Sequence, residues 1–232
     1  MNRPEGPRGR GTGENPENRF ERLHVEYEPS EEELLSPAKV PTLFYRDASR
    51  TVLAENDSPD IPFRFSLNPY RGCEHGCIYC YARPTHEYLS FSAGLDFETR
   101  IMVKQDAPEL LRHALRSPRW QPQVVSLSGN TDCYQPVERR LELTRACLAV
   151  FRDFMNPVGV ITKSALVARD ADLLAELAAN QAAHVFLSIT TLEDELAGRL
   201  EPRAARPPRR LQAIETLARA GVPVGVMVAP LI

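Results

Sequence analysis

The chain has 232 residues, of which 43% are hydrophobic and 25% charged, an ordinary composition for a globular protein with one sizeable core. No apolar run approaches the roughly 20 residues of a membrane-spanning helix, and the polar residues 1–17 are not a secretory signal. We therefore expect a cytoplasmic protein. The formal net charge of −3 gives no overall attraction to nucleic acid, so such binding would need a local basic patch.

The N-terminal part has few apolar residues. Residues 1–20 are rich in Gly, Pro, Arg and Glu, which predicts a disordered tail because little surface could be buried to offset ordering. A nucleic-acid-binding arm is the alternative, but Glu5, Glu14 and Glu17 alternate with the arginines and favour a solvated tail. Residues 21–62, acidic and then punctuated by prolines, predict an irregular extension that wraps a core domain at 63–232.

A cysteine motif follows the first predicted strand of the core domain, at about 63–68. Three of the five cysteines have the spacing C-x-x-x-C-x-x-C, namely Cys73, Cys77 and Cys80. Gly72 and Gly76 let the backbone curl, so that the three sulfurs can face inward around a metal. The odd cysteine count indicates a reducing compartment, where such groups bind metal. His75 is the local candidate for a fourth ligand, which leaves a structural zinc site as an alternative.

Strands and helices alternate through the rest of the core domain. Strands are predicted at about 63–68, 123–128, 158–162, 184–189 and 222–228, and helices at about 106–116, 136–154, 170–179 and 208–220. Strands rich in Val, Ile and Leu, separated by single helices, indicate a parallel sheet with helices packed outside it. A barrel and an open doubly wound sheet both satisfy this pattern. Because the sequence stops at the fifth strand, we expect a C-terminally truncated piece of a longer protein.

Polar residues follow three of the predicted strands, in the segments 128–132 (SGNTD), 162–164 (TKS) and 188–191 (SITT). The carboxyl ends of strands in a parallel barrel meet at one mouth, so these side chains could line one pocket beside the cysteines. Helix capping is the alternative for each residue taken singly. Their occurrence at several strand ends favours a site.

The cysteine loop, with Tyr79 just before its last cysteine, resembles that of radical S-adenosylmethionine (SAM) enzymes, in which three cysteines hold a [4Fe-4S] cluster that binds SAM. Residues 58–87 are similar to a bacterial branch related to spore photoproduct lyase, often labelled DNA repair photolyase-like. The resemblance implies an α/β fold with a partial (β/α)6 TIM-like barrel. It also implies reductive cleavage of SAM to a 5'-deoxyadenosyl radical, an electron donor such as flavodoxin or ferredoxin, and an unknown substrate.

The resemblance further implies a SAM pocket lined by Tyr79, Tyr81, Thr131, Asp132, Lys163 and Ser188. A carboxylate and hydroxyls suit the ribose and ammonium groups of SAM, and a lysine suits its carboxylate. The spore lyases have a hydrogen-donating cysteine shortly before the equivalent of Asp132, where this sequence has Gly129. Cys133 is a candidate replacement, and a thiol packed below the pocket is the alternative. Cys147, on the apolar face of a helix, is predicted to be a core residue.

A basic stretch follows the fourth strand and contains Arg199, Arg203, Arg206, Arg209 and Arg210. These arginines could bind the phosphates of a nucleic acid at the same mouth, although the stretch lacks aromatic residues that would stack on bases. A solvated loop is the alternative. Two non-enzymatic functions also remain open, a zinc- or cluster-binding interaction module and a nucleic-acid-binding regulator.

Overall fold

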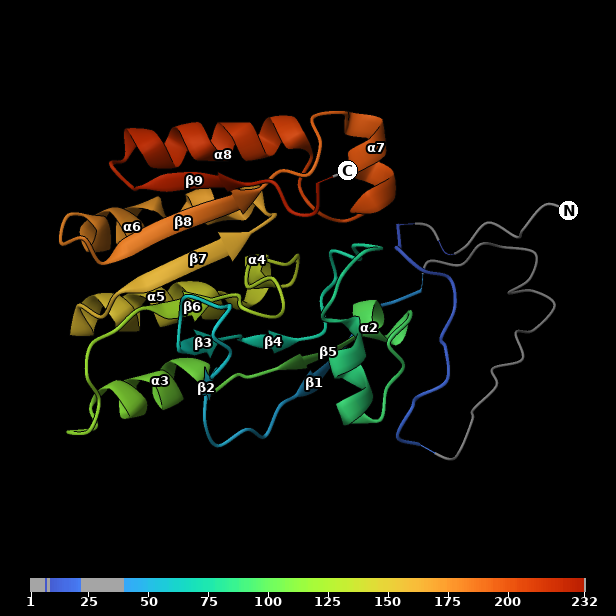
Figure 1. Ribbon diagram of the computed structural model, residues 1–232, viewed down its shortest axis with the longest axis horizontal. Coiled ribbons are helices and arrows are strands. Elements are labelled where there is room, and N and C mark those ends of the chain that lie inside the picture. The colour runs from blue at the N-terminus through green and yellow to red at the C-terminus, as the bar shows by residue number, and fades with distance from the viewer. Residues whose placement is uncertain (1–6, 8, 22–39, 232) are drawn as a thin grey trace, which may run out of the picture.

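A six-stranded sheet organises the chain in this computed structural model, which describes residues 7, 9–21 and 40–231 (Figure 1). Its strand order is β2-β3-β6-β7-β8-β9. The strands are β2 (Leu53–Glu55), β3 (Phe65–Leu67), β6 (Val125–Leu127), β7 (Val158–Thr162), β8 (Ala183–Ser188) and β9 (Val224–Met227). The five strands from β3 to β9 are parallel, and β2 is antiparallel to β3. The prediction of a partial α/β barrel is confirmed, and the described strands form no closed barrel.

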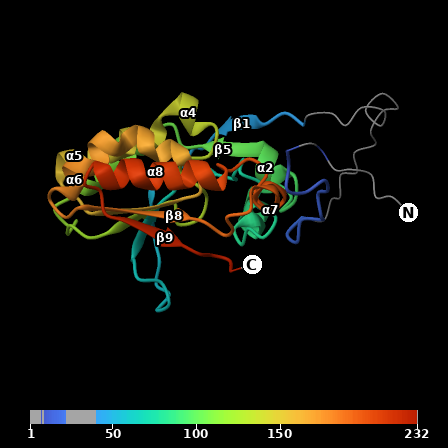
Figure 2. The same cartoon turned by 90° about the horizontal axis from the view of Figure 1, so that it is seen from above.

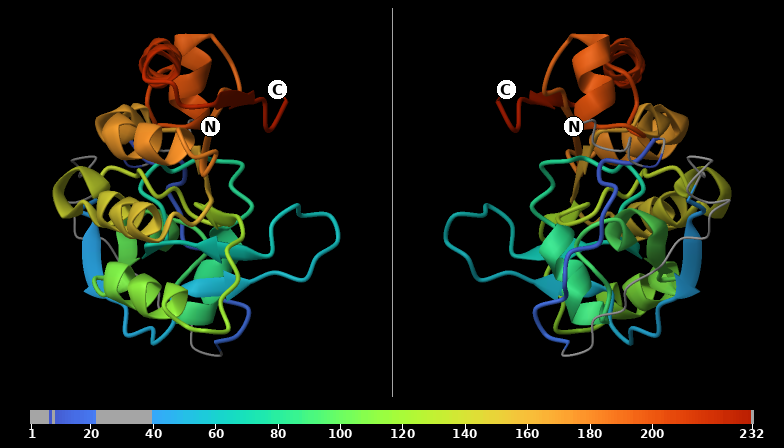
Figure 3. Two further views of the ribbon diagram at one scale, coloured as in Figure 1. Left: turned by 90° about the vertical axis from the view of Figure 1, so that its left-hand side faces the viewer. Right: turned by 90° about the vertical axis from the view of Figure 1, so that its right-hand side faces the viewer.

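Helices connect the successive parallel strands. They are α3 (Ala107–Leu115), α4 (Glu138–Leu141), α5 (Leu143–Phe154), the 3-10 helix η2 (Ala165–Asp170), α6 (Ala171–Ala178), α7 (Asp194–Leu200) and α8 (Pro207–Arg219). Figure 2 shows α4, α5, α6 and α8 together on one side of the sheet, whereas the segment between β2 and β3 projects from the other side (Figure 3). None of the described helices is long and apolar enough to span a membrane.

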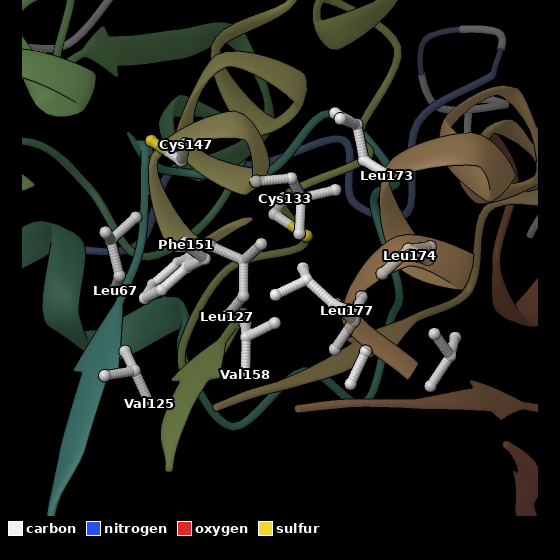
Figure 4. Close-up of a cluster of buried hydrophobic side chains, with 14 of the residues drawn as sticks. Leu67, Val125, Leu127, Cys133, Cys147, Phe151, Val158, Leu173, Leu174 and Leu177 are labelled. Atoms are coloured by element: carbon white, nitrogen blue, oxygen red, sulfur yellow. The ribbon is translucent and has the colours of Figure 1, made fainter. Parts of the chain in front are cut away.

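The core lies between the sheet and this helical layer (Figure 4). In β7 the buried side chains alternate with partly exposed ones, as expected for a strand that is covered more fully on one face. The side of α5 that faces the sheet carries Cys147, Leu148 and Phe151, which are all fully buried. The prediction that Cys147 is a core residue is therefore confirmed.

The helix predicted at 136–154 is two helices, because the chain breaks at Glu142, whose φ of +53° is left-handed. The carboxylate of Glu138 stabilises the chain at the break. It accepts the backbone N–H of Thr144 at 3.0 Å and so satisfies a donor in the first turn of α5. It also accepts the hydroxyl of Tyr70 at 2.5 Å, which ties the break to β4 (Tyr70–Arg71).

A second, three-stranded sheet has the order β1-β5-β4, with β1 at Leu43–Arg46 and β5 at Arg100–Val103. Because β1 pairs with β5 and β2 pairs with β3, part of the predicted irregular extension belongs to the sheets. Their side chains are mostly exposed, so the sequence showed no alternating pattern there. Residues 22–39 of the extension lie outside the described residues.

The described part of the predicted tail packs against the domain. Arg10 donates to the backbone carbonyl of Glu98 at 2.9 Å, and Arg19 donates to the buried carboxylate of Glu87 at 2.6 Å. These polar contacts could not be inferred from a count of apolar residues. The boundaries drawn at residues 20 and 62 remain a prediction.

Candidate active site

The cysteine loop at 72–80 depends on two glycines with left-handed backbone. Gly72 has a φ of +79° and Gly76 a φ of +66°. A Cβ atom at Gly72 would lie 2.9 Å from the carbonyl oxygen of Phe97, and one at Gly76 would lie 2.5 Å from the carboxylate of Glu98. Larger residues at either position would therefore displace the loop.

Two neighbouring segments hold the loop. On one side, the backbone N–H of Cys73 donates to the carbonyl of Phe97, next to α2 (Asp96–Thr99), at 2.9 Å. On the other side, the backbone N–H of Ile78 donates to the carbonyl of Leu200 at 3.0 Å, and that of Arg203 donates to the carbonyl of His75 at 3.1 Å. The segment after α7 is thus built against the loop.

The three loop thiols form no disulfide, and Cys73 and Cys77 are buried. Burial, followed by the charge of Glu201, raises the pKa of Cys77 to about 12, and burial also raises the pKa values of Cys73 and Cys80. Metal binding would therefore have to displace thiol protons.

The arrangement of the thiols bears on the choice between zinc and a cluster. The described His, Cys, Asp and Glu side chains include no group of three or more that is placed to hold a single ion. Cys73, Cys77 and Cys80 instead line one cavity. Three free thiols that line one cavity suit an iron–sulfur cluster, which cysteine thiolates hold.

The cavity has a volume of about 520 Å³, within the range of roughly 300–1,000 Å³ that is usual for small-molecule sites. Its lining includes all three loop cysteines and all six residues predicted to contact SAM, namely Tyr79, Tyr81, Thr131, Asp132, Lys163 and Ser188. These residues come from the loop and from the carboxyl ends of β6, β7 and β8. The structure therefore brings together residues that are up to 115 positions apart, from Cys73 to Ser188.

Asp132 is held by groups from two other segments. Its carboxylate accepts the hydroxyl of Thr162 at 2.7 Å and the backbone N–H of Lys163 at 2.8 Å, and it lies 3.3 Å from Nδ1 of His75. Burial alone would raise the pKa of Asp132, but the charge of His75 and these hydrogen bonds lower it to about 2. The carboxylate is therefore ionised at neutral pH, and it joins the ends of β6 and β7 to the loop.

Thr131 and Ser188 differ in the hydrogen bonding of their hydroxyl groups. Both side chains belong to buried residues. The hydroxyl of Thr131 donates to the carbonyl of Tyr70 at 2.6 Å. The described residues give the hydroxyl of Ser188 no hydrogen-bond partner, so it is free to bind a ligand in the cavity.

Lys163 and Tyr79 meet at Glu201. The ammonium of Lys163 lies 5.6 Å from the ring centroid of Tyr79 and 3.7 Å from the carboxylate of Glu201. Glu201 also accepts the hydroxyls of Tyr79 and Thr190 and pairs with the buried Arg210. The fully buried carboxylate of Glu201 thereby ties the cysteine loop to β8 and α8.

Glu201 and His75 are the site residues whose roles the sequence analysis missed. Glu201 lies within the basic stretch, between Arg199 and Arg203, and its isolated negative charge is the sequence signal that distinguishes it. His75 was considered as a metal ligand, whereas its ring faces Asp132.

Tyr81 is exposed, whereas Cys133 is buried. Tyr81 is 75% exposed at the mouth of the cavity, and its hydroxyl donates to the carbonyl of Gly129 at 2.6 Å. Cys133 is fully buried in the hydrophobic core (Figure 4) and does not line the cavity. Its position favours the alternative that this thiol packs below the pocket, and it does not favour a role as hydrogen donor.

The basic stretch requires one correction. Arg210, predicted to contact phosphates, is 1% exposed and donates to the carbonyl of Ser188 at 2.7 Å, so it cannot reach a nucleic acid. Its burial is stabilised by the charge of Glu201. Arg203 is partly buried and pairs with Glu74 at 3.0 Å. The exposed members of the stretch are Arg199, Arg206 and Arg209.

Comparison with known sequences identifies a family. A family model described as the radical SAM superfamily matches residues 67–232. Uncharacterised proteins of Mycobacterium bovis and Mycobacterium tuberculosis are each 41% identical over 172 residues, or 74% of this chain and 51% of theirs. An uncharacterised protein of Methanocaldococcus jannaschii is 28% identical over 169 residues, covering 73% of this chain and 61% of that one. The chain spans about half the length of the mycobacterial relatives.

Comparison with solved structures supports the fold. Spore photoproduct lyase complexed with dinucleoside spore photoproduct matches with a TM-score of 0.58 and 19% identity, covering 82% of this chain and 52% of that one. A mutant of the same enzyme with bound AdoMet and dinucleoside spore photoproduct gives a TM-score of 0.56 and 18% identity, with coverages of 81% and 50%. At this level of identity the likeness shows a shared fold.

Proposed function

Because the chain belongs to the radical SAM superfamily, whose members use a [4Fe-4S] cluster and SAM, we propose that Cys73, Cys77 and Cys80 hold such a cluster and that the adjoining cavity binds SAM. When bound and reduced, the cluster supplies the electron for reductive cleavage of SAM. The observation that carries the proposal is that three free thiols and three polar strand ends line one cavity.

Each polar residue of the cavity has a proposed task. The Lys163 ammonium, whose side chain is 16% exposed, would bind the carboxylate of SAM, and the unpartnered hydroxyl of Ser188 would bind a polar group such as the ribose. Asp132 would act mainly by fixing the backbone of Lys163, since protein groups already occupy its carboxylate. The backbone at Tyr79 would contact the adenine.

Apolar side chains in the lining of the cavity would shield a reactive species from water. Ile61, Phe63 and Met227 line the same cavity as the cysteines. Two of these residues come from the segment between β2 and β3 that projects from the sheet opposite the helices (Figure 3). A substrate would therefore approach from this side.

The test is anaerobic reconstitution of the full-length protein with iron and sulfide, followed by measurement of 5'-deoxyadenosine formed from SAM with dithionite. We expect about four irons per chain and product formation. Cys77→Ala should lose both, whereas Cys147→Ala, in the core, should keep both. A cluster that forms without any 5'-deoxyadenosine would overturn the enzymatic function. One zinc and no iron after anaerobic purification would favour the interaction module instead.

A nucleic acid is the substrate class that we propose for this enzyme. The structural neighbour that carries this suggestion was solved with a dinucleoside spore photoproduct. The presence of Gly129 and the burial of Cys133 argue against direct transfer of the spore-lyase hydrogen-donor role. Stimulation of 5'-deoxyadenosine formation by ultraviolet-irradiated DNA, but not by undamaged DNA, would support a damaged-DNA substrate. Equal rates with both would contradict it.

A further inference from the structure

We propose that an arginine-lined cavity on the helical side of the sheet is the docking site for an acidic electron-transfer protein that reduces the cluster. This inference rests on the proposed function, because it assumes that the cysteine loop holds a redox-active cluster. This arginine cavity has a volume of about 550 Å³. It differs from the SAM cavity, the name used here for the cavity lined by Cys73, Cys77, Cys80 and Lys163.

The position of this arginine cavity sets it apart from the SAM cavity. Its lining comes from α4, η2, the segment after α7 and the start of α8. Figure 2 shows α4 and α8 on the side of the sheet opposite the projecting segment that lines the SAM cavity. His75 is the one residue that lines both cavities among the described residues, and it lies between Cys73 and Cys77 in the chain. The arginine cavity therefore contacts the cysteine loop at His75, on the side of the sheet that carries the helices.

The charged side chains that line the arginine cavity are basic. Its lining contains Arg139, Arg169, Arg203 and Arg209 but no Asp or Glu. Carboxylates outside the lining neutralise two of them: Arg169 pairs with Glu138 at 2.9 Å and with Asp170 at 2.8 Å, and Arg203 pairs with Glu74 at 3.0 Å.

The other two arginines, Arg139 and Arg209, are exposed and have no carboxylate partner among the described residues. Their charge is thus available to an incoming protein. In a chain of net charge −3, this local positive patch would attract and orient an acidic partner.

Proximity to the cluster loop favours an electron donor over a nucleic acid as the occupant. The backbone carbonyl of His75 accepts the N–H of Arg203, so a protein seated on these arginines would lie against the loop itself. It would leave the SAM cavity open to substrate. A nucleic acid bound here would occupy a cavity that shares only His75, among the described residues, with the cavity we assign to SAM. One electron would leave the donor, which is oxidised by one electron, and reduce the cluster by one electron, with no atoms transferred.

The test compares Arg139→Glu/Arg209→Glu with a matched control, Arg116→Glu/Arg119→Glu, in the reconstituted full-length protein. Arg116 and Arg119 are also exposed, but they precede β6 and lie near the amino ends of the parallel strands. Binding of an acidic flavodoxin is measured by calorimetry at low and high salt, and 5'-deoxyadenosine is measured with either reduced flavodoxin or dithionite. Thermal unfolding checks that both variants fold.

We expect the cavity variant to bind flavodoxin about tenfold more weakly at low salt and to lose a similar factor in the flavodoxin-driven rate. Its dithionite-driven rate, and all properties of the control variant, should match those of the unmodified protein. Equal flavodoxin binding by both variants, or no binding by the unmodified protein, would overturn the inference. Weaker binding of duplex DNA by the cavity variant, with flavodoxin binding unchanged, would also overturn it. Failure of dithionite to yield 5'-deoxyadenosine would refute the proposed function, while calorimetry would still report on docking.

Discussion

Among single residues, Asp132 shows how the site is held together from within. Its carboxylate joins the carboxyl ends of two strands to His75 of the cysteine loop. Its pKa of about 2 keeps it charged at any pH at which the protein is expected to be folded. Its contribution is therefore to fix where the Lys163 backbone and the loop lie, and Lys163 and Ser188 remain the groups with capacity for a ligand.

Replacement of Cys133 by alanine tests the role of the buried thiol. Because the side chain is fully buried in the core, Cys133→Ala should lower the free energy of unfolding by about 1 kcal/mol through loss of packed volume. Iron content and 5'-deoxyadenosine formation should stay unchanged. Urea unfolding and product analysis check this, with Cys147→Ala as the matched core variant. A variant of normal stability that has lost product formation would assign Cys133 to the chemistry.

His86 should make stability depend on pH. Burial lowers its pKa to about 4, and backbone hydrogen bonding at Arg100 and the charge of Asp96 oppose the shift only in part. The unfolded chain, with a histidine pKa near 6.5, therefore binds a proton that the folded chain excludes. Above about pH 6.5, His86 is neutral in both states and does not reduce the free energy of unfolding. As the pH falls from 6.5 to 4, proton binding by the unfolded chain lowers the free energy of unfolding, by at most about 3 kcal/mol.

Urea unfolding of the metal-free protein at several pH values between 7 and 4 measures this dependence. His86→Phe, whose ring should fit beside Phe91 and Phe97, should flatten the curve. His113→Phe, at an exposed position on α3, is the control and should leave the slope unchanged. The same slope in His86→Phe as in the unmodified protein would contradict the assignment.

At the scale of elements, the cysteine loop depends on space as well as on backbone conformation. Gly72 and Gly221 both have a φ of +79°. A Cβ atom added at Gly72 would lie 2.9 Å from the carbonyl oxygen of Phe97, whereas one added at Gly221 would have no neighbour within 4 Å. Gly72→Ala should therefore destabilise the protein by more than the roughly 1 kcal/mol expected from backbone strain alone, and it should lower iron content. Gly221→Ala should lower stability only by the cost of backbone strain and should leave the iron content unchanged. Thermal unfolding and iron analysis compare them, and equal effects would argue against a crowded loop.

Most elements of the main sheet were predictable because their residues carry local patterns. The strand predicted at 158–162 is β7, and the helix predicted at 208–220 is α8 (Pro207–Arg219). The three-stranded sheet was missed because its short strands pair across long separations, as β1 does with β5. The predicted cavity residues do converge. Glu201 was missed because its link to Tyr79 spans 122 positions, a contact that no local pattern encodes.

For the whole molecule, the arrangement separates two approaches to one loop. The SAM cavity is lined in part by Ile61 and Phe63 of the segment between β2 and β3, whereas residues of α4, η2 and α8 line the arginine cavity. Under the proposed function, SAM and substrate would use the first and the electron donor the second. The net charge of −3 makes the arginine cavity a local feature, so high salt should weaken donor binding without affecting reduction by dithionite.

The central claim is that the three cysteines hold a cluster that SAM contacts directly. The electron paramagnetic resonance spectrum of the reduced, reconstituted full-length protein, recorded before and after addition of SAM, tests it. We predict a [4Fe-4S] signal whose g values shift when SAM is added, and no such signal in Cys80→Ala. A cluster signal that SAM leaves unchanged, or a protein that takes up zinc and no iron, would contradict the account.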